Sequence, residues 1–359
     1  MHAVPRHLFA PIRAWCNQPP AGRRIDRDAD PATWWDLVYA PNISVLTQSD
    51  DGASDPLAGK GLWTSALSAP QIVMQFLQQL YVHDHHRVLE IGTGTGWTAA
   101  LLSHRVGDQN VVTVEIDADV AKQAAVNIET SGYAPRLIVG DGADGWPDGA
   151  PFDRVHATAA VDRVPPAWIR QVRPGGVIVF PWSPGFGTGH QVRLVAGPDE
   201  TAVGGFPGGA GYMMLRSQRY ATRWGPFEEE LADKTTSRID PRSIAWDIYG
   251  LDLAVTAMVP GLMSWEESEG DRVSLLLATR EGSSWAWCDF EPGKDEFEVG
   301  QFGDRRLWDE VADAYLRWVS WGRPDRDRFG MTVSPEGQAV WLDTPQNTLT
   351  TTRAGQPMM

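Results

Sequence analysis

Three glycines lie two residues apart in the segment VLEIGTGTGWTAALL, at Gly92, Gly94 and Gly96. They follow an apolar run that predicts a strand and precede a run with helical spacing, so the backbone can turn sharply there and approach a ligand closely. Such a loop is typical of a site that binds a nucleotide-containing cofactor. A tight strand-to-helix turn without a ligand is the simpler alternative.

Acidic residues surround this loop in the sequence. Glu90 lies two residues before Gly92, where a carboxylate favours a cationic ligand over a pyrophosphate. Glu115 ends the next predicted strand, about 20 residues after the loop, where its side chain can accept hydrogen bonds from both hydroxyls of a ribose. Asp141 and Gly142 follow the third strand and are placed to meet an adenine amino group.

These features resemble the cofactor motifs of class I S-adenosylmethionine methyltransferases. The resemblance implies S-adenosyl-L-methionine as cofactor and S-adenosyl-L-homocysteine as its product. The expected binding residues are Glu90, Gly92, Thr93, Gly94, Gly96, Trp97, Thr98, Glu115, Ile116, Asp141, Gly142 and Thr158. A nicotinamide dehydrogenase is the alternative, but Glu90 would repel its pyrophosphate, and the third glycine is displaced from the dinucleotide pattern.

The order of predicted elements is typical of a parallel sheet with helices on both faces. Apolar β-branched runs predict strands at 87–91, 110–116, 136–139, 152–157, 176–181 and 191–195, and the runs between them predict helices at 97–105, 117–130 and 165–171. The fold class is therefore α/β with an additional α+β C-terminal domain, and the resemblance implies a Rossmann-like doubly wound sheet of the class I methyltransferase type.

A second segment, TSALSAPQIVMQFLQQL, lies just upstream of the first strand. Ser68 and Pro70 predict the start of an amphipathic helix, with Ser68 as its cap. The segment is similar to the S-A-P-H-M motif of protein-L-isoaspartate O-methyltransferases, in which the serine lies beside the transferred methyl group. The resemblance therefore implies that Ser68 orients the acceptor carboxylate, with Ser65 and Thr64 as helpers; a capping role is the alternative for these two.

Further matches to this family follow in its order: VPRHLFAP, FDRVHATAA, VRPGGVIVFPW and GYMMLR. Together they cover about the first 220 residues. The sequence departs from the family at Gln71, which replaces a histidine, and at LWTSALS, which replaces a shorter approach to the acceptor motif. These departures put the choice of substrate in question.

Composition narrows the function classes. The 46 acidic and 31 basic side chains give a net charge of −15, which disfavours a nucleic-acid partner. Cys16 and Cys288 are too few for a disulfide framework or a cysteine metal site, and a solvated loop is the simplest interpretation of His83, His85 and His86, so we expect no metal. We expect no signal peptide and no membrane segment, and hence a cytoplasmic protein.

The chain predicts three parts. Residues 1–62 are expected to form a lid or substrate platform, residues 63–220 the methyltransferase domain, and residues 221–359 an α+β domain that could recognise a peptide. Many tryptophans lie in the last part, and core packing explains them more simply than a binding face. Runs at 273–277 and 285–290 predict strands there, and 309–319 predicts a helix.

The extension and the altered acceptor motif resemble the branch of the family associated with ribosomally synthesised modified peptides such as lasso peptides, graspetides and lanthipeptides. The resemblance implies methylation of an aspartate side chain in a macrocyclic precursor peptide, closure to aspartimide, and hydrolysis to isoaspartate. Isoaspartate repair and small-molecule methylation are the alternatives. A catalytically silent peptide-binding protein is a further one, which the intact glycine loop argues against.

Overall fold

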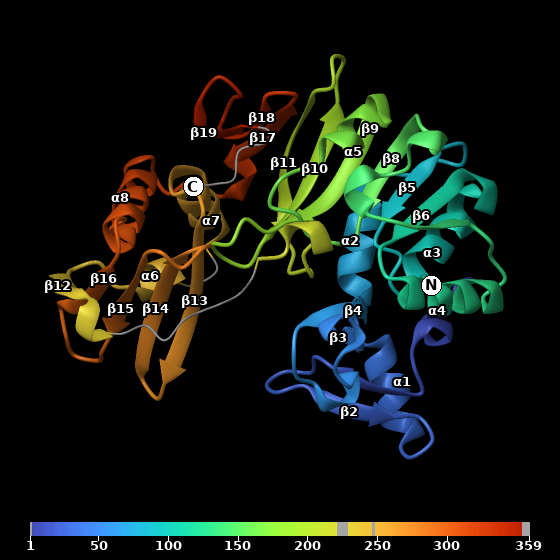
Figure 1. Cartoon of the computed structure of the whole chain (residues 1–359), viewed down its shortest axis with the longest axis horizontal. Helices are drawn as coiled ribbons and strands as arrows, with labels where there is room; N and C mark the ends of the chain where they lie inside the picture. The colour runs from blue at the N-terminus through green and yellow to red at the C-terminus, as the bar shows by residue number, and fades with distance from the viewer. Residues whose placement is uncertain (1, 221–228, 246–247, 354–359) are drawn as a thin grey trace.

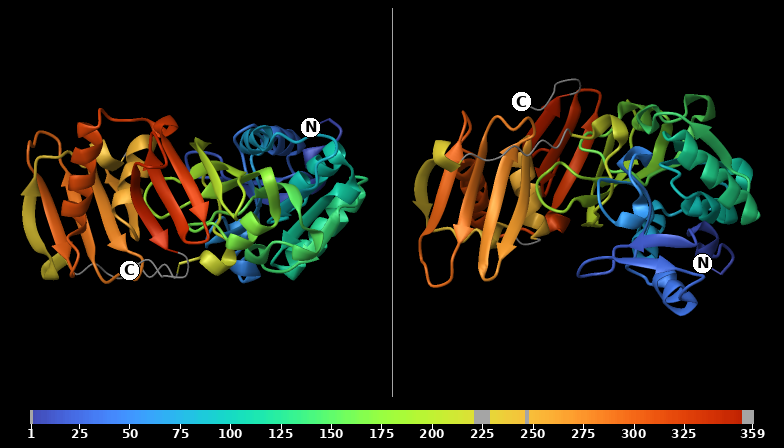
Figure 2. Two further views of the ribbon diagram at one scale, coloured as in Figure 1. Left: turned by 90° about the horizontal axis from the view of Figure 1, so that it is seen from above. Right: turned by 60° about the horizontal axis from the view of Figure 1, so that its bottom comes forward.

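The computed structural model describes residues 2–220, 229–245 and 248–353. The described residues form three sheets, a small N-terminal sheet, a large central sheet and a C-terminal sheet. In Figure 1 the C-terminal sheet lies at the left and the N-terminal sheet lies below the central one. The view from above in Figure 2 shows that the molecule is elongated.

The central sheet has ten strands in the order β19-β18-β17-β11-β10-β9-β8-β5-β6-β7. The strands β5 to β9 pair in parallel, and the others pair antiparallel. The first seven strands in sequence are β5 Val88–Ile91, β6 Val111–Glu115, β7 Arg136–Val139, β8 Phe152–Ala157, β9 Val172–Trp182, β10 His190–Ala196 and β11 Ala202–Gly209. The order reverses next to β5, so the loops after β5 and β8 leave the sheet edge on opposite sides of a crevice.

Alternate residues of the central strands bury against different helices, as the period of two requires. Val88 and Val111 pack with α2 and α3, whereas Leu89 and Val112 belong to the core on the other face, which includes Trp168 of α5. The helices of this unit are α2 Pro70–Leu80, α3 Trp97–Val106, α4 Ala118–Thr130 and α5 Pro166–Arg170. The predicted doubly wound α/β arrangement is therefore confirmed, and each predicted strand and helix of the unit is present, with shifted ends except in β7 and β8.

The N-terminal sheet has the order β2-β1-β3-β4 and carries one helix. Its elements are β1 Arg13–Cys16, β2 Arg23–Asp26, α1 Pro31–Tyr39, β3 Val45–Ser49 and β4 Trp63–Leu67. The fully buried Arg6 guanidinium ties this unit to the acceptor segment, because Nη2 donates to the carbonyls of Leu67 at 3.1 Å and of Ser68 at 2.9 Å. Arg6 thus fixes the position of the acceptor motif at the end of β4.

The C-terminal sheet has the order β12-β16-β15-β14-β13. Its elements and those that follow are β12 Asp233–Ser237, α6 Arg242–Ala245, α7 Tyr249–Met258, β13 Leu262–Glu269, β14 Arg272–Thr279, β15 Trp285–Phe290, β16 Phe297–Phe302, α8 Leu307–Ser320, β17 Phe329–Ser334, β18 Gly337–Leu342 and β19 Thr348–Arg353. This confirms the predicted α+β character of the extension. Trp285, Trp308 and Trp318 are buried there, as core packing requires.

The division into three domains stays a prediction, and two strand pairings cross its boundaries. β4, after residue 62, pairs with β3 of the N-terminal sheet. β17, far beyond residue 220, pairs with β11 and extends the central sheet. The boundary at 220/221 itself adjoins residues 221–228, which lie outside the described residues. Within the described part of the chain, no helix has the length and apolar character needed to cross a membrane.

Candidate active site

A pocket of about 840 Å³, including its open mouth, lies at the carboxyl ends of β5, β6 and β8. The glycine loop forms its floor, and the acceptor segment at the end of β4 forms one wall. The predicted site residues that line it are Thr64, Ser65, Ser68, Gly92, Thr93, Gly94, Trp97, Thr98, Glu115, Ile116, Gly142 and Thr158. Residues predicted for the cofactor and for the acceptor therefore share one cavity.

The glycine loop has a conformation that side chains would prevent. Gly92 and Gly96 have φ values of +88° and +89°, in the left-handed region that favours glycine. A Cβ atom on Gly96 would lie 2.6 Å from Cγ1 of Ile128 in α4, so the loop packs directly on that helix. Gly96 does not line the pocket but sets the direction of the chain as it enters α3.

Glu115 is the carboxylate closest to the glycine loop. Its Oε2 accepts a hydrogen bond from the Gly94 N–H at 2.9 Å, and its Oε1 accepts one from the Asp117 N–H at 3.1 Å. Burial raises the pKa of Glu115, and these N–H donors oppose that rise. Its position at the end of β6, in the pocket wall, suits a group that accepts hydrogen bonds from a ligand.

Glu90 does not line the pocket and is completely buried beneath it. Its Oε2 accepts a hydrogen bond from the Thr113 hydroxyl at 2.6 Å, and the hydroxyls of Thr113 and Thr93 lie 2.6 Å apart. Its Oε1 has no hydrogen-bond partner within the described residues. Burial raises the pKa of Glu90 to about 8. Glu90 is therefore connected to the glycine loop through Thr113 and Thr93, and its direct contact with a ligand stays a prediction.

Asp141 also lies outside the pocket wall, where its carboxylate accepts a hydrogen bond from the Ala143 N–H at 2.9 Å. Gly142 does line the pocket, and a Cβ there would lie 2.4 Å from Cγ2 of Ile91. On the far side, the Thr158 hydroxyl donates to the carbonyls of Ile91 and Gly92. Asp141 thus shapes the turn, and Gly142 is its part that faces the cavity.

The acceptor wall differs from the prediction in one respect. Ser68 does not cap α2: the helix begins at Pro70, its N-cap is Ala69, and no side chain caps it. The reason is that Pro70 has no N–H to accept from, and the Ser68 hydroxyl instead pairs with the Tyr212 hydroxyl. Burial raises the pKa of Tyr212, which keeps its hydroxyl protonated.

Thr64 and Ser65 are strand residues of β4, so neither is a helix cap. The Ser65 hydroxyl accepts from the Thr47 hydroxyl at 2.9 Å, and the Thr64 hydroxyl donates to Oε1 of Gln48 at 2.9 Å. Gln71 is exposed and does not line the pocket. The departure from the family motif at Gln71 therefore lies outside the pocket wall.

Sequence reasoning missed part of the lining. These residues are Ala66, Leu67, Ile91, Thr95, Val114, Ala159, Met213, Met214, Leu215, Arg216 and Arg219. The segment GYMMLR matches the family, but nothing in its pattern indicates that it closes the pocket. The Leu215 N–H donates to the Ala160 carbonyl at 2.7 Å, which fixes this segment beside the loop after β8.

Comparison with known proteins shows what the central part of the chain is similar to. Residues 57–197 match the family model described as protein-L-isoaspartate(D-aspartate) O-methyltransferase (PCMT). The protein-L-isoaspartate O-methyltransferase 1 of Nitrosospira multiformis is 37% identical over 134 residues, which are 37% of this chain and 56% of that protein. The protein-L-isoaspartate O-methyltransferase of Anaeromyxobacter dehalogenans is 44% identical over 117 residues, 32% of this chain and 55% of that protein. The chain spans about half the length of these relatives.

A solved structure named protein-L-isoaspartate O-methyltransferase has a similar fold over 95% of this chain and 92% of its own, with a TM-score of 0.51 and 21% identity. The likeness establishes the class I S-adenosylmethionine methyltransferase fold, with its Rossmann-like sheet and additional C-terminal sheets. It also extends over the C-terminal part that the sequence set apart. Residues 57–197 of this chain are therefore similar to the protein-L-isoaspartate(D-aspartate) O-methyltransferase family.

Proposed function

We propose that this protein is an S-adenosylmethionine-dependent O-methyltransferase that methylates an aspartyl or isoaspartyl carboxylate of a peptide or protein. The observation that carries the proposal is the single pocket in which the glycine loop and Glu115 meet Ser68, Ser65 and Thr64. A donor bound on the loop would present its reactive group to an acceptor held at the end of β4. The names of the relatives point to the same chemistry.

The donor half fits a cationic, ribose-containing cofactor. When bound, S-adenosylmethionine supplies an electrophilic methyl group on a sulfonium. Glu115 would accept hydrogen bonds from the ribose, and Gly94, where a Cβ would meet only the Ala66 carbonyl at 3.7 Å, leaves the backbone room to approach it. The buried Oε1 of Glu90, which has no partner within the described residues, adds negative potential beneath the loop once that carboxyl ionises.

The acceptor half needs to position a nucleophile rather than activate one. An aspartyl carboxylate has an ordinary pKa near ~3.9 and is already ionised at neutral pH, so no strong base is required. Holding it in line with the methyl carbon and removing water from it can contribute ~7–11 kcal/mol. We assign that alignment to the Ser68 hydroxyl, which Tyr212 orients, with Ser65 and Thr64 beside it.

For the substrate, we propose an aspartate in a macrocyclic ribosomal precursor peptide. The methyl ester makes the aspartyl carbonyl more electrophilic; the backbone nitrogen of the next residue attacks it, its proton leaves with the methoxide as methanol, and a succinimide (aspartimide) forms. Water can then open the ring to isoaspartate. The lengthened approach LWTSALS, which forms β4, supports a dedicated substrate.

Isoaspartate repair is the second candidate, and one observation favours it. The solved structure with a similar fold over 95% of this chain is itself named an isoaspartate methyltransferase. The C-terminal extension is therefore no evidence for a precursor peptide, in contrast to what the sequence suggested. A small-molecule acceptor would leave the arrangement around Ser68 without a role.

Mass spectrometry of paired peptides separates these candidates. The protein is incubated with S-adenosylmethionine and with peptides that carry aspartate or isoaspartate, each in linear and macrocyclic form. A gain of about 14 Da followed by a net loss of about 18 Da on cyclic aspartyl peptides alone indicates aspartimide formation, because methylation adds CH₂ and closure removes methanol. Methylation mainly of linear isoaspartyl peptides indicates repair. Transfer to neither class of peptide contradicts the proposal.

A further inference from the structure

Two arginines lie in the wall of the pocket and share a carboxylate from a distant part of the chain. Nη2 of Arg216 lies 2.8 Å from Oδ1 of Asp51, and Nη1 of Arg219 lies 2.8 Å from both oxygens of Asp51. Arg216 and Arg219 line the pocket that also contains Ser68. The pair thus presents a carboxylate-binding fork to the cavity, and an internal carboxylate occupies it.

Asp51 is held loosely compared with the arginines. Its side chain is 43% exposed, against 31% for Arg216 and 18% for Arg219. Asp50 and Asp51 have φ values of +49° and +52°, which are unfavourable for residues other than glycine. The Asp51 backbone N–H is held by the Thr64 hydroxyl at 3.1 Å. A substrate carboxylate can take over these contacts when the exposed Asp51 leaves, so the exchange does not leave the arginines without a carboxylate partner.

The remaining charges around the fork call for a carboxylate. Asp117 contacts Arg216 at 3.0 Å, but it also caps α4 by accepting from the N–H groups of Asp119 and Val120, so its position is fixed. If Asp51 leaves, Arg216 still faces the carboxylates of Asp117 and Glu115, whereas Arg219 loses the carboxylate that it contacts. Within the described residues, Nε of Arg216 is also buried without a hydrogen-bond partner. A second carboxylate would restore the balance.

We propose that Arg216 and Arg219 bind an acidic residue that flanks the methyl acceptor in the substrate peptide, and that Asp51 occupies this subsite until the peptide displaces it. The inference rests on the proposed function and names a specificity determinant for it. The ligand is a flanking carboxylate rather than the acceptor, because two guanidinium groups on the acceptor oxygens would withdraw the electron density that attacks the methyl carbon. The enzyme would therefore prefer acidic peptides despite its own net charge of −15.

The test compares peptides that differ by one charge. Each fluorescent peptide contains one acceptor residue and a single Glu, placed either directly before or directly after the acceptor. Its matched partner carries the isosteric Gln at the same position. Their Kd for the enzyme saturated with S-adenosylhomocysteine is measured by anisotropy, and their methylation by S-adenosylmethionine is measured separately. Binding and turnover then report on different claims.

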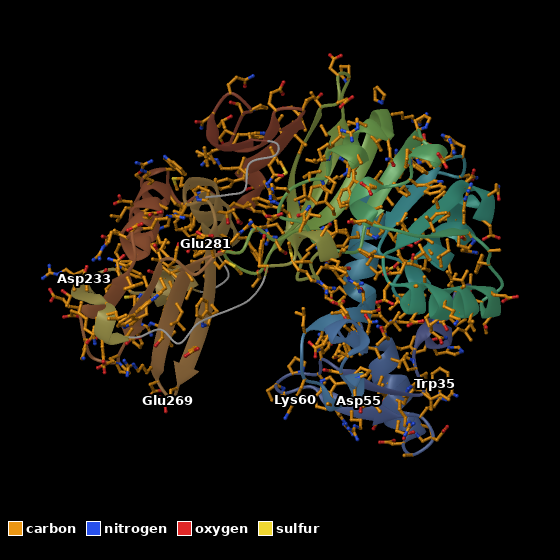
Figure 3. The ribbon with its side chains drawn as sticks, in the orientation of Figure 1. Trp35, Asp55, Lys60, Asp233, Glu269 and Glu281 are labelled. Atoms are coloured by element: carbon orange, nitrogen blue, oxygen red, sulfur yellow. The ribbon has the colours of Figure 1, made fainter. Side chains whose placement is uncertain are left out.

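We expect the Glu peptide to bind about fivefold or more tightly than its Gln partner at one position, and the preference to weaken with added salt. Asp51→Asn removes the internal competitor and should raise the Glu/Gln ratio about threefold further. Arg219→Gln should bring the ratio to about 1. Asp55→Asn is the matched control, because Asp55 lies in the loop between β3 and β4 (Figure 3) and accepts a hydrogen bond from the Leu57 N–H; its ratio should equal that of the wild type.

Each outcome has a distinct meaning. A ratio near 1 at every position, in both the wild type and Asp51→Asn, overturns the inference even if the peptides are methylated. A charge preference that Arg219→Gln removes, without methyl transfer to any peptide, supports the subsite and contradicts the proposed function. An increase of the ratio in Arg219→Gln would also overturn the inference.

Discussion

At the scale of single residues, Ser68 is the side chain on which the acceptor half depends. Its hydroxyl pairs with Tyr212, and its carbonyl is held by Arg6, so both ends are fixed. We expect Ser68→Ala to lower kcat for peptide methylation about 10- to 100-fold, which corresponds to the loss of roughly one to three kcal/mol of orientation. Steady-state kinetics and calorimetry of cofactor binding check this.

The control for Ser68→Ala is Ser320→Ala at the exposed end of α8, where the hydroxyl donates to the Arg317 carbonyl of the same helix. It should leave kcat unchanged. If Ser68→Ala turns over like the wild type, Ser68 has no part in orienting the acceptor.

The buried carboxyl of Glu90 predicts a pH dependence of the free energy of unfolding. Its pKa is raised from the ordinary 4.5 to about 8 by burial, so its carboxyl favours folding below pH 4.5, and this stabilisation is lost as pH rises through 8. Glu90→Gln removes the titration. Relative to the wild type, the variant should lose about 2–4 kcal/mol less unfolding free energy between pH 5 and pH 8.

Denaturant unfolding at both pH values measures this difference, and the comparison cancels the other titrating groups. Among these, His156 acts with the opposite sign, because burial lowers its pKa to about 4 and its contribution is lost as pH falls. An unchanged pH dependence in Glu90→Gln would show that Glu90 is ionised in the folded protein.

Sequence reasoning was most successful for residues whose type follows from local backbone demands. The glycines of the loop and Glu115 lie next to strand ends and are predictable from spacing alone. Arg216 and Arg219 are not, because their role depends on Asp51, which lies 165 and 168 positions away. Nor does the sequence indicate that Glu90 points into the core rather than into the pocket.

At the scale of elements, the contact between the glycine loop and α4 sets the shape of the donor half. Gly96→Ala combines an unfavourable φ of +89° with a Cβ that would lie 2.6 Å from Ile128. Gly132→Ala provides the matched control, because Gly132 has a φ of +87° and nothing within 4 Å of its Cβ position. We expect Gly132→Ala to lower the free energy of unfolding by about 1–2 kcal/mol and Gly96→Ala to lower it by about 2 kcal/mol more, as measured by denaturant unfolding.

Gly96→Ala should also weaken cofactor binding, whereas Gly132→Ala should not. Equal losses of stability in the two variants would mean that the glycine loop can shift away from α4 and that its conformation does not depend on that contact.

Elements were predictable where their period was clear. The strands β7 and β8 match their predicted bounds, because β-branched runs end there at turn residues. The predicted cap of α2 was wrong: Pro70 sets the first turn, and the preceding serine turns toward Tyr212. The local sequence predicts the helix, but the role of the Ser68 side chain depends on its tertiary contact with Tyr212.

At the scale of the whole molecule, the C-terminal part stabilises the loop that follows β8 at the pocket. Arg280 of the extension lies 2.5 Å from Oδ2 of Asp162, and the two side chains are 10% and 2% exposed. Gln338 of β18 accepts from the Val164 N–H at 2.9 Å and donates to the Asp162 carbonyl at 2.8 Å. These contacts fix the loop after β8, which begins with Thr158 of the pocket.

Arg280→Met should therefore destabilise the protein by about 3–5 kcal/mol, because it removes the close ionic partner of the buried Asp162 carboxylate and leaves it, among the described residues, only Arg163 at 4.0 Å. Arg238→Met, which breaks an exposed ion pair with Glu296, is the control and should cost less than about 1 kcal/mol. Thermal or denaturant unfolding measures both. Similar small losses would show that the extension does not brace this loop.

Sequence could place the extension in the α+β class but not join it to the central sheet. β17 follows β11 by more than 100 residues, and such a pairing leaves no local signal. The apolar core confirms the union, since Phe206 of β11 and Met331 of β17 belong to one cluster. The strands of the central part and the strands β17 to β19 of the C-terminal part therefore form one continuous sheet.

The most direct test of the central claim is the chemical nature of the bond that the protein makes. Wild-type protein is incubated with S-adenosylmethionine carrying a labelled methyl group and with an aspartyl or isoaspartyl peptide, and the product is then treated with base. We predict label on the peptide that base releases as methanol, because a carboxyl methyl ester hydrolyses, and loss of labelling in Glu115→Ala. Label that resists base, or label on small molecules but on no peptide, would contradict the account.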